Sequence, residues 1–157
     1  MTRRSERIGR SGEYLTCSVL ARESDTVTIM PHTSHADVIF EWKHKLYRCQ
    51  VKTVTHIEER KKNWRFDIRK GITTTGRHYK KNEIDIIAMV NLEYQTICFK
   101  AFSDCQTAQI TIKDEIMKST NSIDSLKEAM ESIILATNGR QDKNESTSGT
   151  KKTAING

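Results

Sequence analysis

Three side chains in the first third of the chain have types and spacing suited to metal-assisted chemistry on a phosphate. Asp37 stands near the start of one apolar-rich run, and Gln50 and Lys52 stand two residues apart in the next. The runs are rich in β-branched and aromatic residues and flank a polar turn at 43–45, which predicts a β-hairpin. Antiparallel pairing brings the start of the first strand beside the end of the second. A carboxylate, an amide oxygen and an ammonium group at one point could hold a hard divalent cation and a phosphate.

The other elements follow from the spacing of apolar residues. Helical spacing predicts a helix over residues 5–23, which carries Glu13, and a last helix that begins at Asn121 or Ser122 and ends at Gly139. Alternating or continuous apolar runs predict strands at 27–30, 64–69, 83–91, 97–102 and 109–113. This order indicates one mixed α/β domain over residues 1–137. Residues 138–157 are polar and without periodicity, which predicts a disordered tail.

These residues, in this order, resemble the PD-(D/E)XK nuclease superfamily, in which an acidic residue opens one strand and an acid-x-Lys motif lies on the next. Here Asp37 is followed, after twelve intervening residues, by Gln50-Val51-Lys52. The run Gly12-Glu13-Tyr14-Leu15 is similar to the first-helix motif of small group I intron homing endonucleases and of archaeal Holliday junction resolvases. Gln50 stands where Asp or Glu is usual, but a Gln-x-Lys variant occurs in the superfamily, including among the intron-encoded enzymes. The run 46–53 resembles those enzymes most.

The resemblance implies a restriction-endonuclease-like fold, with a mixed central sheet flanked by helices, and a Mg²⁺ site for which Mn²⁺ is expected to substitute. The metal would be held by Asp37, the Gln50 side-chain oxygen, the Val51 carbonyl and Glu13. A bound Mg²⁺ lowers the pKa of its water and neutralises the charge that develops on the phosphate. Lys52 would orient the attacking water or stabilise the phosphate.

Each of these side chains also has an ordinary structural interpretation. An aspartate at a strand end often makes a turn hydrogen bond, and a lone Gln, Lys or Glu is most often a solvated surface residue. Only their joint placement favours a site. Asp85, at the start of a later strand, is interpreted as structural support and not as a ligand. His32 and His35 invite a zinc hypothesis, but no cysteine pair accompanies them, so we reject it.

A dense run of cations lies between residues 60 and 81, where nine Arg and Lys residues oppose one Asp. Such cations neutralise phosphates and release counterions, so we expect this run to bind double-stranded DNA. Arg65 and Arg69 could read guanine edges. Trp64 and Tyr79 are as consistent with packing as with base stacking, and the alternative for the whole run is a solvated strand between loops. The predicted DNA contacts are Arg60, Lys61, Lys62, Arg65, Arg69, Lys70, Arg77, Lys80 and Lys81.

Composition and length indicate which kind of partner, oligomeric state and cellular compartment to expect. The chain has 157 residues, a formal charge of +6 and a pI near 9.2, which favours an anionic partner, nucleic acid first. A domain of this size has a small core, and two DNA strands must be cut, so we expect a homodimer or a homotetramer. No cysteine lies in a Cys-x-x-Cys pair, which fits a reducing cytoplasm. We expect neither a signal peptide nor a membrane-spanning helix, because the chain has no long apolar run.

The sequence therefore predicts a metal-dependent endonuclease that hydrolyses double-stranded DNA in a sequence-specific manner, as homing and restriction enzymes do. Three alternatives remain open, of which a ribosome- or RNA-associated protein rests on charge alone. A Holliday junction resolvase would share the pattern of Glu13, Asp37 and Lys52, and it would prefer junctions to linear duplex. A non-catalytic basic module that binds nucleic acid on the same fold is favoured by Gln50, and it would bind DNA without cutting it.

Overall fold

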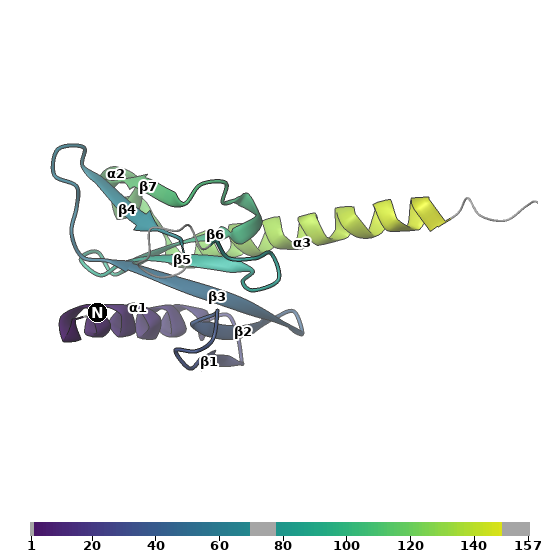
Figure 1. Cartoon of the computed structure of the whole chain (residues 1–157), viewed down its shortest axis with the longest axis horizontal. Coiled ribbons are helices and arrows are strands. Elements are labelled where there is room, and N and C mark those ends of the chain that lie inside the picture. The colour runs from purple at the N-terminus through teal and green to yellow at the C-terminus, as the bar shows by residue number, and fades with distance from the viewer. Residues whose placement is uncertain (1, 70–77, 149–157) are drawn as a thin grey trace, which may run out of the picture.

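The computed structural model describes residues 2–69 and 78–148. Its strands form a five-stranded sheet in the order β1-β2-β3-β5-β6 and a two-stranded sheet of β4 and β7 (Figure 1). The elements, in chain order, are α1 (Arg3–Leu20), β1 (Val27–Ile29), β2 (Val38–Trp42), β3 (Lys45–Val54), β4 (Asn63–Asp67), β5 (Ile86–Asn91), β6 (Thr96–Ala101), a 3-10 turn (Phe102–Asp104), β7 (Gln109–Lys113), α2 (Asp114–Ser119) and α3 (Ser122–Ser148). The predicted mixed central sheet flanked by helices is confirmed.

The predicted hairpin is β2 and β3, joined by a turn in which Lys43 and His44 both have positive φ, at 49° and 65°. Two successive turn residues with positive φ match the right-handed twist of the strands, although Gly or Asn is more usual at these turn positions. On its other side β3 pairs in parallel with β5, with Gln50 opposite Ile87 and Lys52 opposite Met89. Because β3 has a partner on each side, the strand that carries the candidate site is fixed within the sheet.

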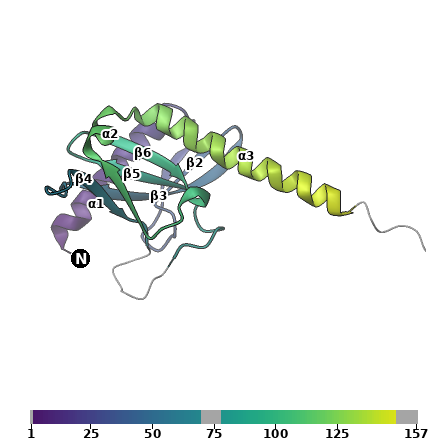
Figure 2. The same ribbon diagram turned by 90° about the horizontal axis from the view of Figure 1, so that it is seen from above.

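Two apolar clusters cover the two faces of the main sheet. On one face, Leu20 of α1 and Leu126 of α3 pack with Phe40 and Val51 of the hairpin. On the other face, Trp64, Phe66, Ile112 and Met117 from β4, β7 and α2 pack on residues of β5 such as Met89. Figures 1 and 2 show α1 lying along β3, with the amino terminus at the end of the molecule that also holds the loop before β4.

Three features differ from the sequence prediction. The strands near 64 and 109 form a separate two-stranded sheet, and their inward side chains close a second core over β5. The short helix α2 was not predicted, since six residues are too few to show a period. Helix α3 continues past Gly139 to Ser148, into the segment predicted to be disordered. A glycine inside a helix costs only about 1 kcal/mol relative to alanine, and no proline follows it.

Within the described ranges, no helix combines the length and the apolar character that crossing a bilayer requires.

Candidate active site

The aspartate that precedes β2 is fixed by the start of the hairpin. The backbone N–H of Asp37 donates to the carbonyl of Cys49 at 3.0 Å, and the N–H of Met30 donates to the Asp37 carbonyl at 2.8 Å. The Asp37 carboxylate oxygen Oδ2 accepts hydrogen bonds from the Val51 backbone N–H, at 2.8 Å, and from the side-chain amide of Gln50. The structure thus brings Asp37, Gln50 and Val51 together at one point, where antiparallel pairing was expected to place them.

The amide of Gln50 presents its nitrogen, not its oxygen, to Asp37. Gln50 is only 7% exposed, so this donor is held against the carboxylate away from bulk water. In this orientation Gln50 stabilises the ionised form of Asp37. A 180° rotation of the amide would exchange the two atoms and turn the oxygen toward the carboxylate, as the predicted ligand role requires.

Helix α1 brings a second carboxylate, Glu13, to the same place. Burial raises the pKa of Glu13, and the nearby charge of Asp37 raises it further, whereas His32 and Arg10 lower it. Burial also raises the pKa of Asp37, against the opposing effects of the Val51 N–H, Lys52, His32 and Gln50. Two half-buried carboxylates that repel each other therefore face one point, with His32 close to both.

The helix can lie this close to the sheet because residue 12 is a glycine. A Cβ atom at Gly12 would overlap the hydroxyl oxygen of Thr53 in β3. The carbonyl of Gly12 accepts a hydrogen bond from the buried Thr16 hydroxyl at 2.8 Å. Gly12 thus sets the distance between α1 and β3, and with it the position of Glu13.

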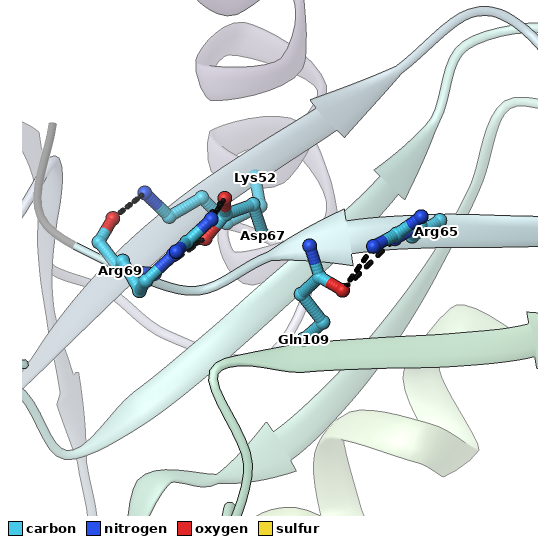
Figure 3. A network of polar contacts seen from close by, with 5 residues as sticks. All are labelled: Lys52, Arg65, Asp67, Arg69 and Gln109. Atoms are coloured by element: carbon cyan, nitrogen blue, oxygen red, sulfur yellow. Dashed lines mark hydrogen bonds and ion pairs between the residues drawn. The ribbon is translucent and has the colours of Figure 1, made fainter. Parts of the chain in front are cut away.

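The ammonium group of Lys52 is held by the segment that follows β4. Its Nζ donates to the carbonyl of Arg69 at 3.1 Å (Figure 3). It also donates to the Tyr79 hydroxyl at 3.5 Å and lies 5.6 Å from the centre of the Tyr79 ring. Burial lowers the pKa of Lys52, although the charges of Asp37 and Asp67 act to raise it. Lys52 is therefore a positioned cation near Asp37, and Tyr79 is a residue of this site that sequence reasoning left undecided.

The oxygen groups at this point fit a hard divalent cation. Mg²⁺ takes oxygen ligands, often one or two carboxylates, and keeps several waters. Glu13 and Asp37 supply two carboxylates, and the second oxygen of Asp37, Oδ1, accepts no hydrogen bond from the described residues. A divalent cation would also relieve the repulsion between them. In the part of the chain that the structure describes, no three His, Cys, Asp or Glu side chains gather as a metal site, so neutral oxygens would have to complete the ligand set.

The predicted cationic run is exposed where it is described, and two of its arginines already have partners. The Arg65 guanidinium donates to the Gln109 side-chain oxygen on β7, and Arg69 pairs with Asp67 (Figure 3). Lys80 lies apart from these two, beside His35 and Arg48 in a separate hollow. Exposed side chains are those of Arg60, Lys61, Lys62, Arg65, Lys80 and Lys81, whereas Lys70 and Arg77 lie outside the described residues.

The two aromatic residues of this run have different roles. Trp64 is fully buried, donates to the Asp114 carboxylate at 2.9 Å and packs edge-on against Tyr94, so it is a core residue and not a base-stacking one. Tyr79 packs edge-on against Phe102 with its hydroxyl toward Lys52. Asp85 is structural, as interpreted from the sequence, because it accepts three hydrogen bonds from the backbone and guanidinium of Arg48.

Comparison with known proteins gives one informative similarity. No protein-family model and no curated protein matches the chain. Among solved structures, the chain is similar to one described as a bacterial homing endonuclease, I-Ssp6803I, with a TM-score of 0.63 and 16% sequence identity. The match covers 87% of this chain and 97% of the other. At this identity the similarity establishes a shared fold.

Proposed function

We propose that the protein is a metal-dependent endonuclease that cleaves double-stranded DNA at specific sequences. The proposal is supported by three side chains from α1, the segment before β2 and β3: the charge of Asp37 acts on Glu13, that of Lys52 acts on Asp37, and Glu13 and Lys52 line one hollow. An exposed row of cations begins directly after β3. The shared fold with a bacterial homing endonuclease supports the same assignment.

In the proposed reaction, Mg²⁺ or Mn²⁺ would be held by Asp37 and Glu13, with the Gln50 side-chain oxygen and the Val51 carbonyl as neutral ligands. Such a cation makes its bound water a better nucleophile and neutralises charge on the phosphate. The Val51 N–H fixes the Asp37 carboxylate. The Lys52 ammonium, already directed by Arg69 and Tyr79, donates a hydrogen bond to the attacking water or to the phosphate.

In the proposed complex, the cations of the segment 60–81 bind the DNA backbone and its base edges. Arg65 is an exposed residue of β4, and Arg69 lies two residues beyond the end of this strand and is partly exposed. A guanidinium can bind guanine with two hydrogen bonds. In the free protein these guanidinium groups donate hydrogen bonds to Gln109 and Asp67. Arg60, Lys61, Lys62, Lys70, Arg77, Lys80 and Lys81 are proposed to contact phosphates.

The protein is proposed to act as a homodimer or a homotetramer, because one copy of the site cuts one strand and duplex cleavage needs two. We place it in the cytoplasm, where a reducing environment keeps its cysteines as thiols. The four cysteines are free in the structure, in keeping with this proposal.

A binding module without catalysis is the second candidate, and one observation favours it. The Gln50 amide nitrogen donates a hydrogen bond to the Asp37 carboxylate, as it would if the pair had only a structural role. Such a module would bind duplex DNA equally well with and without metal, and it would leave the DNA intact.

The test uses a library of DNA duplexes with randomised sequence, incubated with the full chain and with Mg²⁺ or EDTA, followed by sequencing of the cut ends. Lys52→Ala is compared with Lys45→Ala, which removes an exposed lysine from the start of the same strand. We expect metal-dependent cuts at a defined sequence for the parent and Lys45→Ala, and none for Lys52→Ala. Cuts that survive Lys52→Ala would contradict the proposed site. Binding without cutting would favour the second candidate, and cuts at four-way junctions alone would indicate a resolvase.

A further inference from the structure

The amino-terminal half of α1 carries an unassigned concentration of positive charge. Arg3, Arg4, Arg7 and Arg10 are all exposed, and Glu6 is the one acidic residue among them. No ion pair with any of these four arginines occurs within the described ranges. Arginines without an ion pair to the described residues are suited to an anionic partner.

Three of these arginines form a stripe on one side of the helix. Arg3, Arg7 and Arg10 follow the spacing i, i+4, i+7, so they share a face, and Tyr14 continues this face with 59% of its surface exposed. The opposite face, which includes Gly12 and Thr16, is buried.

The stripe borders the candidate active site. At 3.6 residues per turn, Arg10 lies only about 60° around the helix from Glu13, which follows it by three residues. The charge of Arg10 acts on Glu13, which agrees with this placement. The stripe therefore runs from the edge of the site toward the amino terminus.

A groove lies between α1 and β3, on the other side of Glu13 from the stripe. It has a volume of about 430 Å³ and is lined by Ser5, Gly9 and Glu13 from the helix and by Lys52, Thr55 and His56 from the other side. A Cβ atom at Gly9 would meet nothing within 4 Å, so the helix leaves open space there. Because Glu13 and Lys52 both line the groove, it opens directly onto the site and offers hydroxyl and imidazole groups to a polar strand.

We propose that α1 is a second DNA-binding surface, on which the backbone of the duplex beside the scissile phosphate lies along the stripe. Arg3, Arg7 and Arg10 bind its phosphates, and Tyr14 packs against the sugars. This inference rests on the proposed function and extends it beyond the cationic run 60–81.

Dimensions and position agree with this assignment. The seven steps from Arg3 to Arg10 rise about 10 Å along the helix, which matches about three phosphate steps of one strand at about 3.4 Å each along the duplex axis. The amino-terminal half of α1 and the loop before β4 lie at the same end of the molecule in both views (Figures 1 and 2). That loop carries Arg60, Lys61 and Lys62, so the duplex would lie between two basic surfaces.

The test measures binding of the parent's cleavage site by fluorescence anisotropy, in EDTA, from 0.05 to 0.3 M salt. In the triple variant Arg3→Gln, Arg7→Gln, Arg10→Gln, we expect the slope of log K against log salt to fall in magnitude by about 2 to 3, because each phosphate contact contributes about 0.9. The affinity should fall on the order of 10²-fold at 0.1 M salt. Hydroxyl-radical footprints should lose protection on one side of the cut.

A matched control removes the same charge elsewhere. The triple variant Arg22→Gln, Lys45→Gln, Arg140→Gln changes three exposed cations outside the stripe, and it should keep most of the slope and the full footprint. Replacement of the three stripe arginines by lysine should also keep the slope, since lysine retains the charge.

Three outcomes would overturn the inference. If the stripe variant matches the control variant in slope and footprint while the parent binds and cuts DNA, α1 is not a DNA surface and the proposed function stands. If the parent binds no duplex DNA, the proposed function fails together with the inference. If the stripe variant loses affinity for single-stranded RNA but not for duplex DNA, the surface serves a different nucleic acid.

Discussion

The ammonium nitrogen of Lys52 lies 3.1 Å from the backbone carbonyl oxygen of Arg69. The same Arg69 uses its guanidinium to bind Asp67 on the exposed side of β4. One residue of the proposed DNA-binding segment therefore holds the candidate catalytic lysine through its main chain and faces solvent with its side chain. DNA that moves Arg69 would also move Lys52, so recognition and cleavage are expected to be coupled.

Tyr79 is expected to position Lys52 through its hydroxyl and its ring. Tyr79→Phe keeps the ring and should lower kcat only a few-fold, since a net hydrogen bond is worth about 1 kcal/mol. Tyr79→Leu removes the ring as well and should lower kcat further, with KM little changed. Cleavage rates at saturating DNA give this comparison, and a change confined to KM would show that Tyr79 binds DNA instead.

The pH dependence of cleavage should report the burial of Lys52. Burial lowers the pKa of this ammonium, so the rate should fall on the alkaline side before the ordinary lysine pKa of about 10.4 is reached. Tyr79→Leu admits water to Lys52 and should move this fall to higher pH. An alkaline limb that is the same in both proteins would assign it to another group.

Glu13→Gln should stabilise the metal-free protein at neutral pH. The pKa of Glu13 is raised in the folded state, so its contribution to stability is present at low pH and is lost as the pH rises through the folded pKa. Above that pKa the ionised carboxylate is a cost that the amide does not carry. Thermal unfolding in EDTA at pH 7 measures this, with Glu6→Gln, an exposed residue of the same helix, as the control.

Bound metal should make the parent more stable than Glu13→Gln. A cation bound only by the folded protein stabilises it by about 2.7 kcal/mol at a concentration one hundred times its Kd. We expect Mg²⁺ to raise the melting temperature of the parent and to have little effect on Glu13→Gln. Equal shifts in the two proteins would place the metal elsewhere.

Gln50→Glu should tighten metal binding and weaken the metal-free fold. A carboxylate is a better ligand for Mg²⁺ than an amide oxygen. At this buried position it would also face Asp37, and the hydrogen bond from the amide would be lost. Titration with Mn²⁺, followed by its electron spin resonance signal, measures the affinity; loss of binding would remove Gln50 from the ligand set.

Two glycines of α1 should respond to alanine in opposite ways. Gly12→Ala places a Cβ on the Thr53 hydroxyl and should cost about 1 to 3 kcal/mol, as overpacking does. Gly9→Ala meets nothing and should stabilise the helix by about 1 kcal/mol. Urea unfolding measures both, and a Gly12→Ala protein as stable as the parent would show that α1 can shift away from β3.

The sequence predicted the elements whose contacts are local or whose patterns are long. The hairpin of β2 and β3 has a period of two and a polar turn, so the meeting of Asp37 with Gln50 could be predicted from pairing alone. Helix α1 was predicted from its apolar face, but the reason for its position, Gly12 against Thr53, involves a contact that no local pattern reports.

The remaining features depend on contacts between distant residues. Tyr79 reaches Lys52 across twenty-seven positions in the chain, and a lone tyrosine in a basic segment gives no sign of this. His32 acts on both carboxylates from the loop before Asp37, where its type suggested only a weak zinc hypothesis. The separate pairing of β4 with β7 likewise depends on which apolar faces meet after the main sheet has formed.

The parallel pairing of β3 with β5 has a consequence for the order of folding. The hairpin can form early, because its two strands are joined by two residues, whereas β5 must return from more than thirty residues away. Contacts between distant residues form slowly because a long loop must be closed first. Asp37 and Gln50 are therefore expected to meet early in folding, whereas Lys52 gains its hydrogen-bond partners only when Arg69 and Tyr79 reach it. A partly folded chain would carry the carboxylate without its positioned cation, so the candidate site is complete only in the fully folded domain.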